Sequence, residues 1–257
     1  PPPPPPPRPP RDSIRRQRQM CIRDRYKTVQ NNAVYAGMVE SVDTNLGRIV
    51  DRLQELGLSE NTVLILSSDH GGLSSRGLES KRELATSNLP YRHGKGWLYD
   101  GGLRVPLIVK WPGKVQAGSV SPVQVTGTDH YPTLLELAGV PLRPEQHSDG
   151  RSYSAALAGE THQRDPMFFH SALGRPAQTG DTRSSAVIHG DWKLIQWYSL
   201  EDESIERSEL FNLAQDPYEQ ENRFAAEPEK AAELGTLLNE WTRSVNARLG
   251  KFKRGGV

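Results

Sequence analysis

The chain has 257 residues, of which 35% are hydrophobic and 25% charged, with 23 glycines and 20 prolines. This length suffices for one large domain or for a domain with a smaller one attached, and the composition indicates loop-rich structure with a non-globular segment. No apolar run reaches the roughly 18 residues that a membrane-spanning helix needs, and a single cysteine excludes an intramolecular disulfide.

The net charge of +1 is unevenly distributed, because residues 1–27 carry eight basic and two acidic side chains. This segment begins with seven consecutive prolines and continues as an Arg-rich stretch without periodicity. A basic arm can bind nucleic acid or a membrane surface. Low-complexity sequence that cannot bury a core favours a disordered or non-native leader instead. We therefore expect no nucleic-acid partner and begin the fold at Thr28.

The first ordered segment has the pattern of an α/β unit. From Ala33 to Leu56 the apolar residues recur at steps of three and four, which places them on one helical face, and Gly57 is positioned to end that helix. The apolar run at 62–66 predicts a buried strand of a parallel sheet. Helix, tight connection and buried strand together predict a doubly wound, mixed or parallel sheet.

The segment 71–103 is rich in glycine, serine and charged residues, and loops of this length in compact domains are usually functional or disordered. A second buried strand is expected at 105–109, and a short helix at 131–138. We expect the α/β part to span residues 28–160.

A different pattern follows in residues 161–257. Short strands are expected at 167–169, 185–188, 192–195 and 209–213. His189-Gly190-Asp191 predicts a hairpin turn between the second and third of them. An amphipathic helix is expected at 227–248. Together these elements predict an antiparallel subdomain with a packed terminal helix.

Two segments carry residues suited to chemistry. The sequence SSDHGG at 67–72 follows the first strand, where ligands bind in open α/β sheets. Asp69 and His70 can offer two donors to a metal, and the glycines let the backbone turn tightly. The same pattern is also typical of a plain turn, so both interpretations stay open.

The second segment, RHGKG at 92–96, places three cationic or potentially cationic side chains within four residues. Because glycines flank Lys95, this side chain and His93 can approach a tetrahedral oxyanion and donate hydrogen bonds to it. A solvated basic loop has the same composition, so this segment alone does not decide its role.

Taken in order along the chain, these segments resemble the formylglycine-dependent sulfatases of the alkaline phosphatase superfamily. The resemblance covers roughly residues 28–245. The matching stretches are YAGMVESVDTNLGRIVDRL at 35–53, SDHGG at 68–72, GKGWLYDGGLRVPLIVKWPG at 94–113, TDHYPTLL at 128–135, WKLI at 192–195, ELFNL at 209–213 and DPYEQEN at 216–222.

The resemblance implies a hydrolase of sulfate esters, of carbohydrates above all, in which a formylglycine hydrate attacks sulfur. It implies that Asp69 and His70 bind Ca²⁺, which holds sulfate oxygens. Lys95 is implied to contact the sulfate group and to offset charge that builds on its oxygens, with His93 as a possible helper beside it. Arg104 is implied to be structural, and Asp100 stands where relatives often have Glu.

One part of the family pattern is unmatched. The family nucleophile lies in a C-x-P/A-x-R motif, whereas the single cysteine here, Cys21, lies in the basic leader with Arg23 at the proline or small-residue position. We therefore expect a C-terminal fragment that lacks the nucleophile region and is inactive alone.

Two other functions remain open. One is a phosphodiesterase or phosphonate hydrolase of the same superfamily, and the other is a non-catalytic domain that binds sulfated glycans. Most relatives are exported, which implies a periplasmic or extracellular parent enzyme. The sequence indicates neither the oligomeric state nor the particular sulfate ester.

Overall fold

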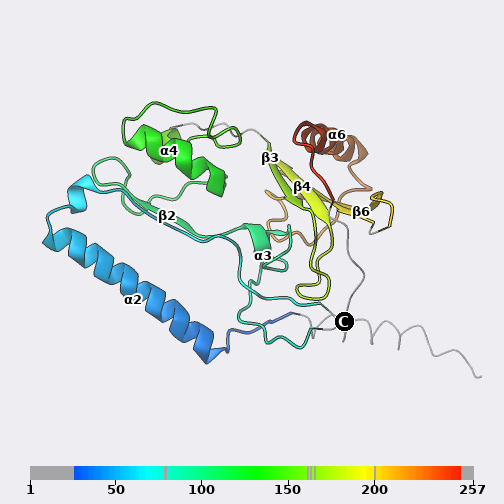
Figure 1. Cartoon of the computed structure of the whole chain (residues 1–257), viewed down its shortest axis with the longest axis horizontal. Coiled ribbons are helices and arrows are strands. Elements are labelled where there is room, and N and C mark those ends of the chain that lie inside the picture. The colour runs from blue at the N-terminus through cyan, green and yellow to red at the C-terminus, as the bar shows by residue number, and fades with distance from the viewer. Residues whose placement is uncertain are drawn as a thin grey trace, which may run out of the picture.

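The computed structural model describes residues 26–77, 80–160, 162, 164, 166–199 and 201–249. The chain forms an N-terminal α/β part followed by an antiparallel sheet with a terminal helix (Figure 1). The elements of the first part are α2 (Ala33–Glu55), η1 (Ser59–Asn61), β1 (Leu64–Ser67), α3 (Asp100–Leu103), β2 (Leu107–Lys110), η2 (Gly127–Asp129), α4 (His130–Leu137) and α5 (Ser154–Leu157).

Helix α2 begins and ends where its sequence predicts. The Asn32 side chain accepts a hydrogen bond from the Tyr35 N–H at 2.9 Å, which caps the first turn. Gly57, with φ of +68°, follows the last turn in the left-handed conformation that glycine allows.

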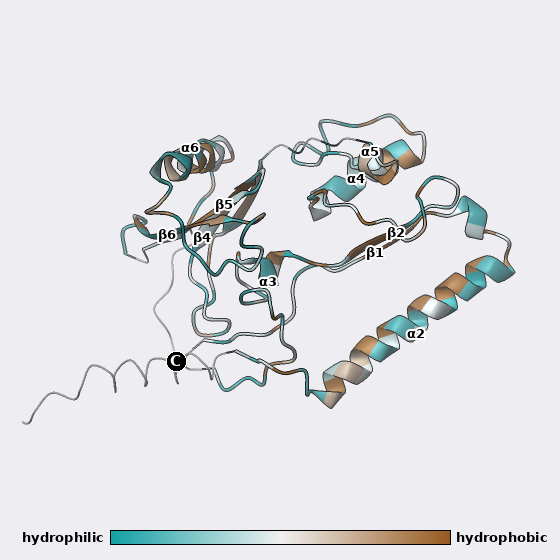
Figure 2. Cartoon of the chain, turned by 180° about the vertical axis from the view of Figure 1, so that it is seen from behind, coloured by the Kyte–Doolittle hydropathy of each residue, from teal (hydrophilic) through white to brown (hydrophobic). Residues whose placement is uncertain are grey.

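The apolar face of α2, in contrast, is uncovered. None of its residues is buried, and Val34 is 77% exposed while Met38 and Val42 are each 62% exposed. Figures 1 and 2 both show α2 running apart from the sheets, and Figure 2 shows hydrophobic residues along its length. The helix therefore exposes an apolar face of the kind that is usually packed against another element or protein.

The two strands of the first part correct one prediction. They pair in antiparallel fashion, with Leu64 opposite Lys110 and Ser67 opposite Leu107, and residues 64–66 are half-buried. We expected a buried strand in a parallel arrangement. The apolar pattern locates a strand but does not encode the direction of its partner, which here is set by the path of the 71–103 loop.

The start of the fold also differs from the expectation. The sequence places Tyr26 and Lys27 in the leader, yet both pack on the folded chain. Tyr26 forms an isolated bridge with Ser75, and the Lys27 N–H donates to the Ser74 carbonyl at 3.0 Å. The folded chain therefore includes two residues more than predicted. Cys21 lies outside the described residues.

The C-terminal part confirms its predicted elements. Strands β3 (Met167–Ser171), β4 (Ser184–His189), β5 (Trp192–Tyr198) and β6 (Ile205–Asn212) form an antiparallel sheet in sequence order, followed by α6 (Pro228–Ser244). Gly190, with φ of +57°, forms the turn between β4 and β5 as expected.

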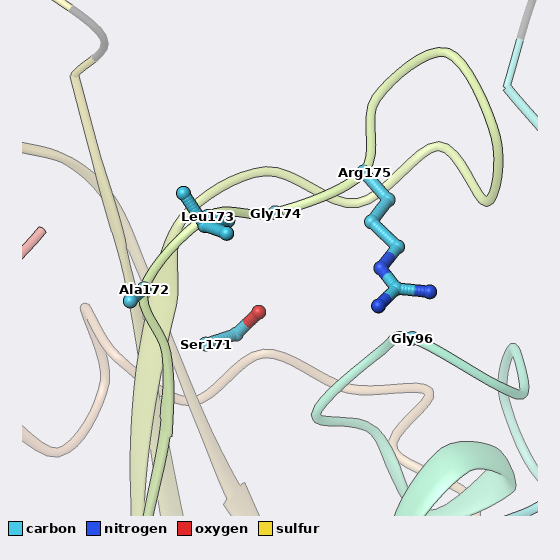
Figure 3. A pocket seen from close by; sticks show the side chains of 6 residues that line it. All are labelled: Gly96, Ser171, Ala172, Leu173, Gly174 and Arg175. Atoms are coloured by element: carbon cyan, nitrogen blue, oxygen red, sulfur yellow. The ribbon is translucent and has the colours of Figure 1, made fainter. Parts of the chain in front are cut away.

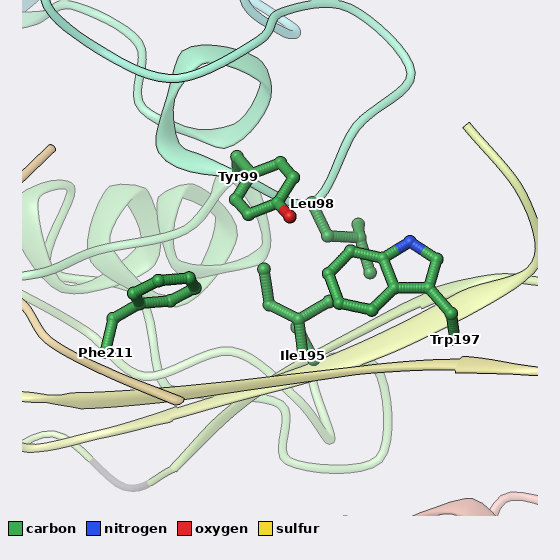
Figure 4. Close-up of a cluster of buried hydrophobic side chains, with 6 residues drawn as sticks. Leu98, Tyr99, Ile195, Trp197 and Phe211 are labelled. Atoms are coloured by element: carbon green, nitrogen blue, oxygen red, sulfur yellow. The ribbon is translucent and has the colours of Figure 1, made fainter. Parts of the chain in front are cut away.

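This sheet is covered on both faces. Because side chains alternate along each strand, every strand can contribute side chains to both covered faces. On one face, the inward residues pack against α6; this cluster contains Val187, Leu194, Leu210, Ala231, Leu234 and Leu238. On the other face, the sheet packs against the chain just before α3, as Figure 4 shows; this cluster contains Leu98, Tyr99, Ala186, Ile195, Trp197 and Phe211. The second contact fixes residues 97–103 on the C-terminal sheet.

In the part of the chain that the structure describes, no helix is both long and apolar enough to cross a bilayer.

Candidate active site

The structure brings the two predicted chemical segments together, although the 19 residues 73–91 separate them in the sequence. The Gly71 N–H donates to the Gly102 carbonyl at 2.9 Å, and the Lys95 N–H donates to the Gly72 carbonyl at 3.0 Å. A Cβ atom on Gly71 would lie 1.8 Å from the Gly101 oxygen, and one on Gly94 would lie 2.3 Å from the Gly72 oxygen. The glycines are therefore required for this close backbone approach.

Asn88 holds the two segments in register, and the sequence analysis did not identify it. Its amide nitrogen lies 2.8 Å from the Gly72 oxygen, 2.9 Å from Ser74 Oγ, 3.0 Å from the His93 oxygen and 3.1 Å from the Gly101 oxygen. The two amide protons are thus shared among four acceptors. An asparagine in a Gly- and Ser-rich loop has no periodic pattern that would have distinguished it.

Asp69 and His70 lie at the end of β1 as predicted. The Asp69 side chain is 81% exposed, and its Oδ2 lies 3.1 Å from His70 Nε2. His70 Nδ1 lies 3.0 Å from the Gly71 carbonyl oxygen, which can only accept, so Nδ1 carries the proton. Both ring nitrogens therefore face oxygen acceptors, and a proton or a cation shared by Nε2 and the Asp69 carboxylate would stabilise the pair.

The pair supplies only part of a calcium site. Calcium takes about six to eight oxygen ligands, and Asp69 and His70 offer one carboxylate and one imidazole nitrogen. Within the described ranges, no group of three or more His, Cys, Asp or Glu side chains gathers to complete it. The exposed carboxylate suits a hard cation, and further ligands would have to come from other groups.

Lys95 is half-buried between Gly94 and Gly96, and Gly96 has a φ of +92°. No carboxylate among the described residues pairs with its ammonium group. The hydrogen bond from its backbone N–H to the Gly72 carbonyl places the backbone of Lys95 beside the segment that carries Asp69. A lysine in this position can bind an anion held near the end of β1.

His93 occupies a different kind of position. Its ring stacks on Trp97 with centroids 3.7 Å apart and on Tyr99 with centroids 4.9 Å apart. The Tyr26 hydroxyl lies 3.2 Å from Nε2. Burial, with the nearby Arg92 and Arg207 charges, lowers the pKa of His93 to about 3. A neutral ring in an aromatic stack shapes the loop around Lys95.

Behind the loop lies a buried charge cluster made of Lys193, Asp100 and Glu219. Lys193 Nζ on β5 is 2.8 Å from Asp100 Oδ1 and 2.6 Å from Glu219 Oε1. The backbone N–H of Asp100 donates to Glu219 Oε2 at 2.7 Å. Burial raises the pKa of Glu219, and the Lys193 ammonium opposes that shift. All three side chains lie in stretches that resemble the sulfatases, but the sequence does not show that they meet.

A second ion pair also attaches the 92–104 segment to the C-terminal sheet. The Arg92 guanidinium lies 3.1 Å from Glu209 Oε2, which also accepts a hydrogen bond from the Tyr99 hydroxyl at 2.7 Å. Arg104 lies over the Tyr91 ring at 5.1 Å and 3.7 Å from Asp100 Oδ2, which fits the structural role expected for it. Charged and aromatic contacts thus hold both ends of the 92–104 segment.

The α/β fold, with an acidic strand end and a glycine-flanked lysine on the adjoining loop, agrees with the resemblance to the alkaline phosphatase superfamily, and comparisons with known proteins show the family. A family model described as Sulfatase matches residues 1–140, and one described as N-sulphoglucosamine sulphohydrolase, C-terminal, matches residues 92–245. This chain belongs to the sulfatase family.

Individual relatives agree with this assignment. A sulfatase of Formosa agariphila is 35% identical over 242 residues, covering 85% of this chain and 41% of the relative. Human steryl-sulfatase is 36% identical over 141 residues, covering 54% of this chain and 24% of the enzyme. The chain therefore spans less than half the length of these relatives.

Solved structures show the same likeness. A protein in complex with its substrate, D-glucosamine-2-N,6-O-disulfate, is 30% identical with a TM-score of 0.61, over 80% of this chain and 39% of that one. A phosphonate monoester hydrolase from Silicibacter pomeroyi is 24% identical with a TM-score of 0.54, over 79% of this chain and 38% of that one. The second likeness shows a shared fold alone.

Proposed function

We propose that this chain is the C-terminal part of a hydrolase of sulfate esters, in which Lys95 binds the sulfate group. The observation that supports the proposal is the hydrogen bond between the Lys95 backbone N–H and the Gly72 carbonyl, which joins the Lys95 loop to the segment that carries the Asp69–His70 pair. In this position the ammonium would offset negative charge that builds on sulfate oxygens as the ester bond breaks.

The proposal assigns Asp69 and His70 to a calcium ion. The exposed Asp69 carboxylate and the His70 Nε2 atom that faces it suit a shared cation, with other groups completing the ligand set. Bound calcium would supply Lewis-acid polarisation of the sulfate oxygens. Within this chain, Asp69 orients that cation and Lys95 binds the anion.

His93 enters the proposal as a positioning residue. Its ring lies in the stack with Trp97 and Tyr99, where the low pKa keeps it neutral. It would therefore support the backbone of Gly94 and Lys95 without transferring a proton.

The proposed substrates are sulfated carbohydrates. The relatives include an N-acetylgalactosamine-6-O-sulfatase and an N-acetylglucosamine-6-O-sulfatase of Bacteroides thetaiotaomicron, which are 27% and 30% identical to this chain. Steryl-sulfatase matches a shorter stretch, 54% of this chain against 78% and 80% for the two glycan enzymes. The longer matches favour a carbohydrate.

Calorimetry with inorganic sulfate and Ca²⁺ tests these assignments on residues 1–257. A hydrogen bond to a charged group contributes about 1.5–3 kcal/mol, so Lys95→Ala should weaken sulfate binding by about tenfold or more. Lys114→Ala, which removes an exposed lysine from a turn, should leave it unchanged. Asp69→Asn should weaken calcium binding. Equal sulfate affinity in the wild type and Lys95→Ala would refute the role of Lys95.

Activity separates the fragment proposal from its alternatives. We expect this chain alone to give no more aryl sulfate hydrolysis than Lys95→Ala. Turnover well above that variant would show that the chain contains a working nucleophile. Calcium and sulfate binding that both fail in a folded chain would favour a non-catalytic domain.

A further inference from the structure

A cavity of about 250 Å³ opens beside Lys95 and is not part of the site described above. It lies between the loop that contains Gly96 and the segment that follows β3. Its walls are Gly96, Ser171, Ala172, Leu173, Gly174 and Arg175, as Figure 3 shows. Ligand pockets for drug-sized molecules are about 300–1,000 Å³, so this cavity suits one substituent of a larger ligand.

The loop that carries Arg175 is rigid. The Arg175 carbonyl accepts hydrogen bonds from the N–H groups of Gln178, Thr179 and Gly180 at 3.0, 2.9 and 3.1 Å. The Arg175 N–H donates to the Asp181 carbonyl at 2.9 Å, which closes the loop. Such a loop holds its backbone in a defined position without help from a ligand.

The same loop is joined to the segment that carries Lys95. The Trp97 indole N–H donates to the Thr179 carbonyl at 2.9 Å. A Cβ atom on Gly96 would lie 2.8 Å from Thr179 Oγ1, so only glycine fits there without displacing the neighbour. The spacing between Lys95 and Arg175 is therefore set by direct contacts.

The polar groups of the cavity suit an anion. The Arg175 side chain is exposed and has no ion pair with any described residue. In Figure 3 its guanidinium and the Ser171 hydroxyl both extend into the space between the two loops. A guanidinium binds sulfate or carboxylate through two parallel hydrogen bonds, and a hydroxyl adds a third donor.

We propose that this cavity is a second anionic subsite, in which Arg175 binds another sulfate or a carboxylate of the saccharide whose first sulfate lies on Lys95. This inference rests on the proposed function and extends it, because it makes the preferred substrate a saccharide with two or more anionic groups. Arg175 is then a specificity-determining residue.

Calorimetry on the whole chain with three probes tests the subsite. The probes are a monosaccharide with one sulfate, the same monosaccharide with two, and a singly sulfated disaccharide that contains a uronic acid. We expect Arg175→Gln to weaken binding of at least one doubly anionic probe by about tenfold and to leave the singly sulfated one unchanged. If the disulfated probe responds, the second group is a sulfate; if the uronic acid probe responds, it is a carboxylate.

Two further variants make the outcomes separable. Arg175→Lys keeps the positive charge but lacks the two parallel N–H donors of the guanidinium. Its affinity for the doubly anionic probe should therefore lie between those of the wild type and Arg175→Gln. Arg143→Gln removes an exposed arginine elsewhere and should change nothing. If Lys95→Ala weakens all three probes but Arg175→Gln weakens none, the subsite is refuted while the proposed function stands. If Lys95→Ala weakens none, the proposed function fails.

Discussion

Replacing Lys193 by methionine should destabilise the protein more than any surface change, because it leaves two carboxylates buried without their cation. Lys193 and Glu219 are 0% exposed and Asp100 is 6% exposed. Methionine keeps most of the aliphatic stem, so the packing loss is small. Removing one partner of a buried ion pair costs about 3–5 kcal/mol, and this is the loss of unfolding free energy that we expect.

The size of the loss of unfolding free energy in Lys193→Met depends on the pH. Burial already raises the pKa of Glu219, and removing the Lys193 charge raises it further. Glu219 in the folded variant therefore takes up a proton at a higher pH than an ordinary glutamate does, which removes one of the unpaired charges. The destabilisation should be greatest at alkaline pH and should shrink as the pH falls.

Urea unfolding followed by tryptophan fluorescence measures the effect, since Trp192 and Trp197 both lie on β5 beside Lys193. Lys230→Met is the matched control, because Lys230 forms an exposed ion pair with Glu233 on α6 and should lose under about 1 kcal/mol.

A double variant tests the coupling. Adding Glu219→Gln to Lys193→Met removes one unpaired carboxylate and should recover part of the loss. Hydrogen exchange in residues 92–102 should rise in the single variant, since Asp100 joins this segment to the sheet. A loss below about 1 kcal/mol for Lys193→Met, or no recovery in the double variant, would refute the argument.

Three further predictions concern protonation and the uncovered helix. The His93 ring should stay neutral down to about pH 4 in an NMR titration, because its pKa is about 3, and the stability tied to the neutral ring should disappear as the pH falls through that value. A normal titration near pH 6.5 would contradict its burial. Burial raises the pKa of Asp181 to about 7, so the wild type should lose stability on the order of 4 kcal/mol as the pH rises from 4 to 7. Asp181→Asn should flatten that slope in thermal melts, and an unchanged slope would refute the assignment. Glutamate at Met38 and Val42 should reduce self-association of the chain in sedimentation velocity, because both side chains are 62% exposed on α2. Equal association in the wild type and the double variant would show that this face is not responsible.

Much of the candidate site could be predicted from short stretches of sequence. Local patterns located the Asp69–His70 pair and the glycine-flanked Lys95 as candidates, and only the resemblance to the sulfatases implied their roles. Their neighbours were not located, because Asn88, Glu219 and Arg175 lie in irregular segments whose side chains acquire partners only after the chain has folded. The unexpected place of His93 has the same cause, since the rings of Trp97 and Tyr99 surround it only in the folded loop.

The sequence by itself located α2, α4, α6 and the strands, because apolar periodicity is a property of residues close together in the chain. Tertiary structure alone decided that β1 and β2 are antiparallel and that the apolar face of α2 is open. It also decided that Lys95 lies beside Gly72. These features depend on which distant segments meet, and the meeting of Gly71 with Gly101 is possible because neither residue has a side chain to keep the backbones apart.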